Sequence, residues 1–249
     1  MRNIRLIGEA FPESPALDTA VSRALLQRVS SGFEPETLRL YRPGPIVAFG
    51  PQDVRAQGYR AAVQATRDEG YHAVNRLAGG RAAVFHEGTI AFAWTIPDPD
   101  PRARVWERFD EIAEIMATAL KSLGVDARVG EVPGEYCPGK HSVNARGVKK
   151  IMGVGQRTIS RAAHVGGVLV VSGSRRIRDV LTPVYDALEL DWDPEATGSV
   201  EDELGVGEFE DVKHAVLDEF VSRYELTEGK LDAATIAVAR SLEGEHVPS

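Results

Sequence analysis

The chain has one cysteine among its 249 residues, which excludes an internal disulfide and a cysteine-rich metal site. It has no apolar run near the roughly 18–20 residues that a membrane-spanning helix needs, and no apolar signal core follows its first charged residues. Basic residues are outnumbered, since 29 lysines and arginines stand against 37 aspartates and glutamates, and the net charge is −8. A protein that binds a nucleic-acid backbone would need a basic stripe instead. These absences favour a cytoplasmic protein that has neither nucleic-acid nor membrane partners.

Short strand-like and helix-like segments alternate along the chain without an internal repeat, which is typical of an α/β or α+β fold. The residue patterns predict strands over 4–7, 38–41 and 46–49, and helices over 15–29, 59–69, 105–123, 177–188 and 209–224. Pro183 should break or kink the helix in which it stands. We expect mixed β-sheets flanked by helices in one large domain, residues 1–189. An acidic, helical C-terminal extension, residues 190–249, should pack on the same domain.

A tight turn is predicted at Gly79-Gly80, because paired glycines let the backbone turn sharply and approach a ligand closely. Arg76 and Arg81 flank this turn, and His86 ends the segment. The two arginines offer charge-assisted hydrogen bonds to a carboxylate or a phosphate. The simpler alternative is a β-turn with solvated arginines at the surface.

A second candidate segment is the predicted strand over 147–157, which contains Gly153 and Gly155. Glycine inside a strand often marks the close approach of a ligand or of another backbone. Lys149 and Lys150 are consecutive, so one of them points inward if this segment is a strand. An inward lysine needs an anionic partner, because an unpaired buried charge is costly. The alternative is a solvated lysine pair on an edge strand.

The single cysteine, Cys137, lies in a predicted loop with two cationic residues close behind it. Nearby cations favour the nucleophilic thiolate, although a lone cysteine is often an inert apolar residue. Residues 134–140 nearly match a phosphate-binding loop, but His141 stands where Ser or Thr should bind magnesium, and 143–147 has no helical period. We therefore reject a phosphate loop.

Another candidate, His164, opens a predicted strand, where a structural histidine is the default interpretation.

The order of these motifs resembles the lipoate-protein ligase A and octanoyltransferase family of the biotin/lipoate-protein ligase superfamily. The resemblance extends over about residues 3–190 and rests on segments 16–26, 39–41, 47–52, 76–86, 150–153 and 164–166. It implies the catalytic-domain fold of that superfamily. It also implies an acyl or acyl-adenylate pocket that includes Arg76, Gly79, Gly80, Arg81, His86 and His164. Lys150, followed by Gly153, would hold the acyl carbonyl or the adenylate phosphate.

Two chemistries occur in the family that this chain resembles. Ligases use ATP to make lipoyl-AMP and pass the lipoyl group to a lysine of a lipoyl domain. Transferases take octanoyl from acyl carrier protein and hold it as a thioester on a cysteine. Cys137 lies 13 positions before Lys150, close to the placement in one transferase branch. The resemblance therefore implies transfer of octanoyl or lipoyl through a Cys137 thioester, with Lys150 polarising the acyl carbonyl.

Such a transferase would need no cofactor and no metal. Its donor would be acyl carrier protein, and its acceptor a lipoyl domain of a 2-oxoacid dehydrogenase or the glycine cleavage H protein. The 60 residues from Leu190 to Ser249 are short for the accessory domain of many ligases, which favours the transferase. Two alternatives stay open: an ATP- and magnesium-dependent lipoate ligase in which Cys137 is incidental, and a non-catalytic lipoate- or fatty-acid-binding protein on the same fold.

Overall fold

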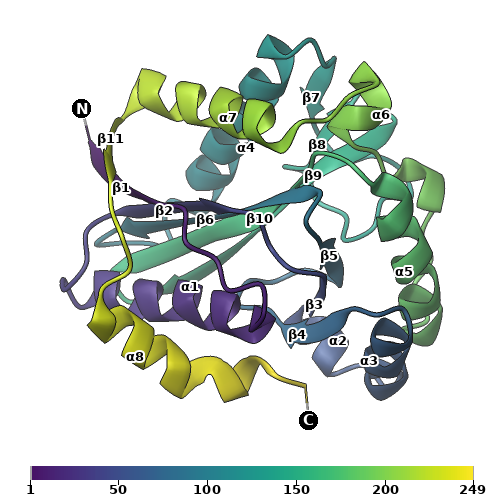
Figure 1. Ribbon diagram of the computed structural model, residues 1–249, viewed down its shortest axis with the longest axis horizontal. Coiled ribbons are helices and arrows are strands. Elements are labelled where there is room, and N and C mark those ends of the chain that lie inside the picture. Colours follow the sequence, from purple (N-terminus) through teal and green to yellow (C-terminus); the bar gives the residue numbers. More distant parts are fainter. Residues whose placement is uncertain (1, 249) are drawn as a thin grey trace.

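The computed structural model describes residues 2–248 and is built around a mixed sheet of eight strands (Figure 1). In spatial order these are β11 (Glu225–Glu228), β1 (Asn3–Ile7), β2 (Thr37–Tyr41), β6 (Thr89–Pro97), β10 (Ala162–Val170), β9 (Lys149–Ile159), β8 (Val143–Ala145) and β7 (Ala127–Val129). Strand β1 pairs in parallel with β11 and with β2, whereas the remaining neighbours are antiparallel. The expected mixed sheet flanked by helices is confirmed.

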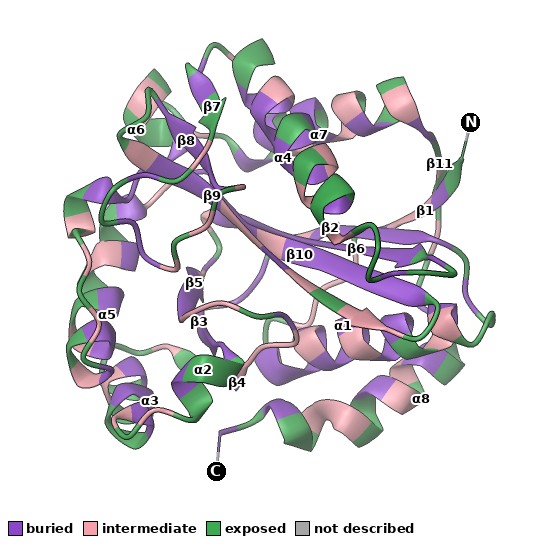
Figure 2. Ribbon diagram, turned by 180° about the vertical axis from the view of Figure 1, so that it is seen from behind, coloured by how far each residue is buried: buried purple, intermediate pink, exposed green. Residues whose placement is uncertain are grey.

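Helices cover both faces of this sheet. Figure 1 shows α4 (Val105–Ser122) and α7 (Phe209–Arg223) on one face and α1 (Pro15–Ser30) and α8 (Ala233–Leu242) on the other. The central strands therefore lack a solvated face. In β6, eight of nine residues are buried, and the burial colouring of Figure 2 shows the same for much of β10. Such strands read as nearly continuous apolar runs because both of their faces pack against helices.

A second sheet of three strands lies beside the first, in the order β4 (His72–Asn75), β3 (Ile46–Phe49) and β5 (Ala83–Phe85). Helices α3 (Tyr59–Asp68) and α5 (Ser174–Ala187) pack on it and share one apolar cluster with it. Four short helical segments complete the described chain: α2 (Pro51–Val54), η1 (Pro194–Ala196), α6 (Val200–Leu204) and η2 (Glu243–His246). No helix of the described residues is both long and apolar enough to cross a membrane.

Of the expected break or kink at Pro183, the break does not occur, because α5 runs through this residue from Ser174 to Ala187. A proline inside a helix removes one backbone hydrogen bond. Val180, Leu181 and Val184 are buried on both sides of Pro183, against α3 and the small sheet. Their burial offsets the lost hydrogen bond, so tertiary packing overrides the local preference.

The C-terminal segment is also less uniformly helical than expected. After α7 the chain forms β11, which joins the edge of the large sheet by pairing with β1, and α8 then packs against α1. Val212, Val216 and Phe220 of α7 belong to the same apolar core as the sheet. We keep the division at residue 190 as a proposal about domain organisation.

Glu36, the residue before β2, provides a test of the packing around this strand. Its buried carboxylate accepts a hydrogen bond from Trp94 Nε1 at 2.8 Å and pairs with Arg2 at 3.0 Å. Burial raises the pKa of this carboxyl from 4.5 to about 7, against the lowering effect of Arg2 and Trp94. The folded state therefore holds a proton that the unfolded chain releases, and the stability from this group is lost as the pH rises from 4.5 to about 7.

We expect Glu36→Gln to remove this part of the pH dependence, which amounts to about 3 kcal/mol in the free energy of unfolding. Urea unfolding across this pH range measures the effect. Glu210→Gln is the matched control, since the Glu210 side chain is 59% exposed. Identical pH profiles for the two variants would contradict the expectation.

Candidate active site

Cys137 lies in the loop between β7 and β8 with a strained backbone, at φ +44°. For a non-glycine residue this left-handed conformation must be held by its surroundings. The Cys137 N–H donates to the Tyr185 hydroxyl at 2.9 Å, and that hydroxyl donates to Ala82 O at 3.0 Å. Tyr185 of α5 therefore ties the cysteine loop to Ala82, the residue before β5.

Lys150 reaches the same loop from β9 because the strand contains an irregularity. Val143 pairs with Met152 and Asn144 pairs with Lys150, so Ile151 has no partner and forms a bulge. A bulge changes the direction of the neighbouring side chain. Lys150 consequently shares a face with Gly153, and a Cβ on Gly153 would lie 3.2 Å from Lys150 Cε. The expected inward lysine is thus Lys150, which is 1% exposed, and glycine at position 153 leaves room for it.

The anionic partner that an inward lysine requires is Glu135. Its Oε1 lies 3.1 Å from Lys150 Nζ and accepts hydrogen bonds from Gly139 N at 3.0 Å and Ser142 Oγ at 2.6 Å. Its Oε2 accepts one from Val132 N at 3.0 Å. Both side chains of the ion pair are almost fully buried, so each charge depends on the other. The carboxylate also holds the loop around Cys137 together.

The Gly79-Gly80 turn approaches the sulfur of Cys137. Arg81 donates its backbone N–H to Sγ at 3.2 Å, and Arg76 donates from Nη2 at 3.5 Å. Gly80 has φ +101°, and a Cβ there would lie 2.0 Å from Arg76 Nη2 and 2.8 Å from Sγ. Only glycine therefore leaves space for the arginine and the sulfur to meet.

The electrostatics at Cys137 favour its thiolate. Burial raises the pKa of the thiol, but the charges of Arg76 and Lys150 and the hydrogen bonds from Arg81 N and Arg76 outweigh burial. The pKa consequently lies below its ordinary value. A lowered thiol pKa in a cationic surrounding is the property of a reactive cysteine.

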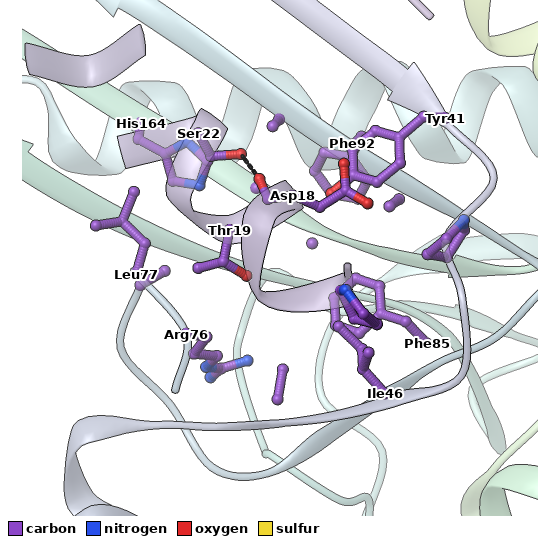
Figure 3. Close-up of a pocket in the computed structure, with 18 of the residues that line it drawn as sticks. Asp18, Thr19, Ser22, Tyr41, Ile46, Arg76, Leu77, Phe85, Phe92 and His164 are labelled. Atoms are coloured by element: carbon purple, nitrogen blue, oxygen red, sulfur yellow. Dashed lines mark hydrogen bonds between the residues drawn. The ribbon is translucent and has the colours of Figure 1, made fainter. Parts of the chain in front are cut away.

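Two neighbouring cavities lie near this position. The smaller, about 290 Å³, is lined by Cys137, Lys150 and Gly153 among others. The larger, about 680 Å³ and partly open to solvent, lies between α1, the large sheet and the loop after β2. Figure 3 shows this larger cavity with Arg76 and Phe85 at its edge. Arg76, Phe85 and Gly167 line both cavities, so the two cavities are neighbours, and Cys137 lines the smaller one.

The larger cavity exists because one face of the central strands carries small residues. The register aligns Ala93 of β6, Gly166 of β10 and Gly155 of β9 in one cross-strand row. Residues of one row point to the same face of a sheet. Ala93 and Gly166 line the larger cavity, and with at most a methyl group at these two positions the sheet leaves room for a narrow apolar chain. Gly155 instead leaves room for Ala78 and Gly79, because a Cβ on it would lie 3.1 Å from atoms of both.

The far part of this cavity is more polar. Asp18 and Ser22 of α1 reach it, and His164 faces them from β10 (Figure 3). Asp18 pairs with the fully buried Arg39 at 2.7 Å, which compensates both charges. Burial lowers the pKa of His164 to about 4, assisted by the charge of Arg39, so the ring is neutral at pH 7. Its Nδ1 has no hydrogen-bond partner among the described residues.

The side chains of the other predicted site residues line neither of the two cavities. His86 lines neither cavity, and its Nδ1 accepts the Gly88 N–H at 3.0 Å in the turn before β6. The Arg81 side chain points to Asp53, at 3.2 Å, so its backbone rather than its guanidinium contacts Cys137. Lys149, the outward lysine, pairs with Glu195 at 3.3 Å.

Three contributors were missed by the sequence analysis: Glu135, Tyr185 and Asp53. Glu135 could have been found, because it stands two positions before Cys137 and the inward lysine needed an acid. Tyr185 gave no such signal, since it lies 48 positions from Cys137 in a helix of ordinary pattern. No group of three or more His, Cys, Asp or Glu within residues 2–248 could hold a metal ion.

Comparison with models of protein families identifies the family of this chain. A family model described as the lipoyl protein ligase A/B catalytic domain matches residues 14–221. The chain belongs to this family. The match covers β2, β9, β10 and the cysteine loop, and it ends within α7. The family resemblance derived from the motifs is therefore confirmed.

Two curated relatives of the chain are octanoyl-GcvH:protein N-octanoyltransferases. The protein of Geobacillus kaustophilus is 29% identical over 159 residues, which are 64% of this chain and 56% of the relative. The protein of Oceanobacillus iheyensis is 26% identical over 208 residues, 80% of this chain and 74% of the relative. The chain thus spans little more than half the length of the first of these relatives.

Solved structures show the same fold. A lipoate-protein ligase A bound with ATP superimposes with a TM-score of 0.78 at 21% identity, over 98% of this chain and 95% of the other. A bi-partite lipoate protein ligase of Thermoplasma acidophilum gives 0.74 at 20% identity, over 98% and 93%. At this identity the likeness establishes the fold.

Arg76→Met tests the electrostatics of the sulfur. Removing this charge should raise the pKa of Cys137, because the adjacent positive charge stabilises the thiolate. The pH dependence of alkylation by iodoacetamide measures the pKa. Arg175→Met is the control, since the Arg175 side chain is 88% exposed. The same alkylation midpoint in both variants would refute the assignment.

Gly80→Ala tests the close approach at the turn. The new Cβ should push the guanidinium away from the sulfur and slow alkylation of Cys137 at neutral pH by at least tenfold. Gly70→Ala imposes a similar backbone strain, at φ +78°, but its Cβ would meet nothing within 4 Å. If both alanine variants react at the wild-type rate, the turn does not control the sulfur.

Proposed function

We propose that this protein transfers an octanoyl or lipoyl group onto a lysine of a lipoyl domain, through a thioester on Cys137. The observation that carries this proposal is the placement of the lone sulfur. Cys137 lines the smaller of two neighbouring cavities, its Sγ accepts hydrogen bonds from Arg81 N and Arg76 Nη2, and its pKa is lowered. These are the conditions under which a thiolate attacks an acyl carbonyl.

The acyl chain would occupy the larger cavity, with its carbonyl carbon beside Sγ. Octanoyl and lipoyl are slender apolar chains, which suits the space over Ala93 and Gly166. Covalent catalysis would divide the transfer into two easier steps: the thiolate first takes the acyl group, and the acceptor lysine amine then displaces it. No cofactor is needed for this chemistry, and a free thiol nucleophile suits a reducing location such as the cytoplasm.

The relatives suggest the protein partners. Both relatives are named octanoyl-GcvH:protein N-octanoyltransferase. This name makes octanoylated glycine cleavage H protein a candidate donor for the present chain, beside octanoyl-acyl carrier protein. The lipoyl domains of 2-oxoacid dehydrogenases are then the proposed acceptors, and H protein is a further acceptor when acyl carrier protein is the donor.

An ATP-dependent lipoate ligase is the second candidate, because a lipoate-protein ligase A bound with ATP shares the fold. In that reaction the acyl group is activated as an adenylate and Cys137 has no covalent role. The ligase predicts pyrophosphate exchange that depends on lipoate and is retained in Cys137→Ser. The transferase predicts no such exchange.

The decisive measurement is the intact mass of the protein after incubation with each octanoylated donor. We expect an increase of one octanoyl group that hydroxylamine removes, and we expect no adduct with Cys137→Ser or Cys137→Ala. Transfer to a lipoyl domain should fall by at least a thousandfold in both variants. Full transfer by Cys137→Ser, or a wild type without any adduct, would refute the thioester.

A further inference from the structure

The Lys150 amine has no donor left for a substrate. An ammonium group has three N–H donors. Nζ lies 3.1 Å from Glu135 Oε1, 2.9 Å from Tyr136 O and 2.7 Å from Cys137 O, so the cysteine loop occupies all three. An acyl oxygen that bound this amine would displace one of these acceptors and leave it unpaired in the protein interior.

Other donors already converge on the reacting atom. Arg81 N and Arg76 Nη2 lie 3.2 Å and 3.5 Å from Sγ. Arg81 N belongs to the backbone of the turn and is therefore fixed in place. Arg76 Nη2 also donates to Gly79 O, so both of its N–H groups are in use, but the buried Nε has no hydrogen-bond partner among the described residues and keeps a donor in reserve. The contact between Nη2 and Sγ places the guanidinium beside an acyl carbonyl that would be bonded to the sulfur.

We infer that the Arg81 backbone N–H and the Arg76 guanidinium form the oxyanion hole, and that Lys150 is a positioning residue for the cysteine loop. This inference rests on the proposed thioester function. It departs from the expectation that Lys150 itself polarises the acyl carbonyl. Gly80 is required for this oxyanion hole, because any side chain at position 80 would fill the space between the Arg76 guanidinium and the sulfur.

The chemistry explains why donors to the sulfur also serve the oxygen. As the thiolate attacks, the sulfur–carbon bond forms and the carbonyl π electrons move onto oxygen. The bond to the donor's amine or thiol then breaks as the carbonyl re-forms, and the leaving group takes the proton that the thiol lost. Negative charge thus moves from sulfur to an oxygen two bonds away. Donors fixed beside the sulfur stabilise both states with little rearrangement.

Two rates measured on the same cysteine separate the two roles. Alkylation by iodoacetamide needs the thiolate but creates no oxyanion, whereas acylation by the octanoylated donor protein needs both. We compare single-turnover acylation with alkylation, each corrected for the thiolate fraction, in wild type, Arg76→Met and Lys150→Gln. Glu135→Gln removes the other charge of the ion pair and should loosen the same loop. It takes the place of Lys150→Gln if circular dichroism shows that Lys150→Gln does not fold.

The ratio of acylation to alkylation should fall about a hundredfold in Arg76→Met, the loss typical of one oxyanion donor. In Lys150→Gln and Glu135→Gln both rates should fall by the same factor, which leaves the ratio at the wild-type value. A ratio that falls in Lys150→Gln, or one that stays unchanged in Arg76→Met, would overturn the inference. A wild type that is alkylated at Cys137 but never acylated would instead refute the proposed function.

Discussion

The buried ion pair between Lys150 and Glu135 is the interaction on which the cysteine loop depends. Neither charge could exist in the interior alone, and removing one partner of such a pair leaves an uncompensated charge at a cost of about 3–5 kcal/mol. The pair also distributes its hydrogen bonds over the loop, since the lysine holds two carbonyls and the carboxylate holds two backbone N–H groups and Ser142. The strained conformation of Cys137 is stable because this network surrounds it.

The second constraint on the site is that several positions around it must carry a very small side chain or none. Gly153 admits the lysine, Gly80 admits the contact between arginine and sulfur, and Ala93 with Gly166 opens the sheet face above the larger cavity. Glycine inside strands weakens a sheet. Here the central strands are buried between two layers of helices, and that packing compensates for the weakness. The packing of the helices thus compensates for the stability that the sheet loses where small residues leave a cavity on its face.

The motifs that sequence analysis singled out meet in space to different degrees. Cys137, Lys150, Gly153 and Arg76 line one cavity, although Arg76 stands 61 positions before the cysteine. His86 belongs to the same linear motif as Arg76, yet it closes a turn outside both cavities. Proximity in the chain is therefore a weak guide to a shared site, because a strand reverses the direction of alternate side chains and a turn can lead away from the ligand.

The sequence by itself determined the mixed α/β class, most helices and strands, the family, and the presence of one buried lysine near one cysteine. These follow from local periodicity, from motif order and from the rule that a buried charge needs a partner. Only the tertiary structure decided that β11 joins the sheet, that a bulge turns Lys150 toward the cysteine loop, and that Tyr185 holds that loop. Such features depend on contacts between residues far apart in the chain, which no local pattern encodes.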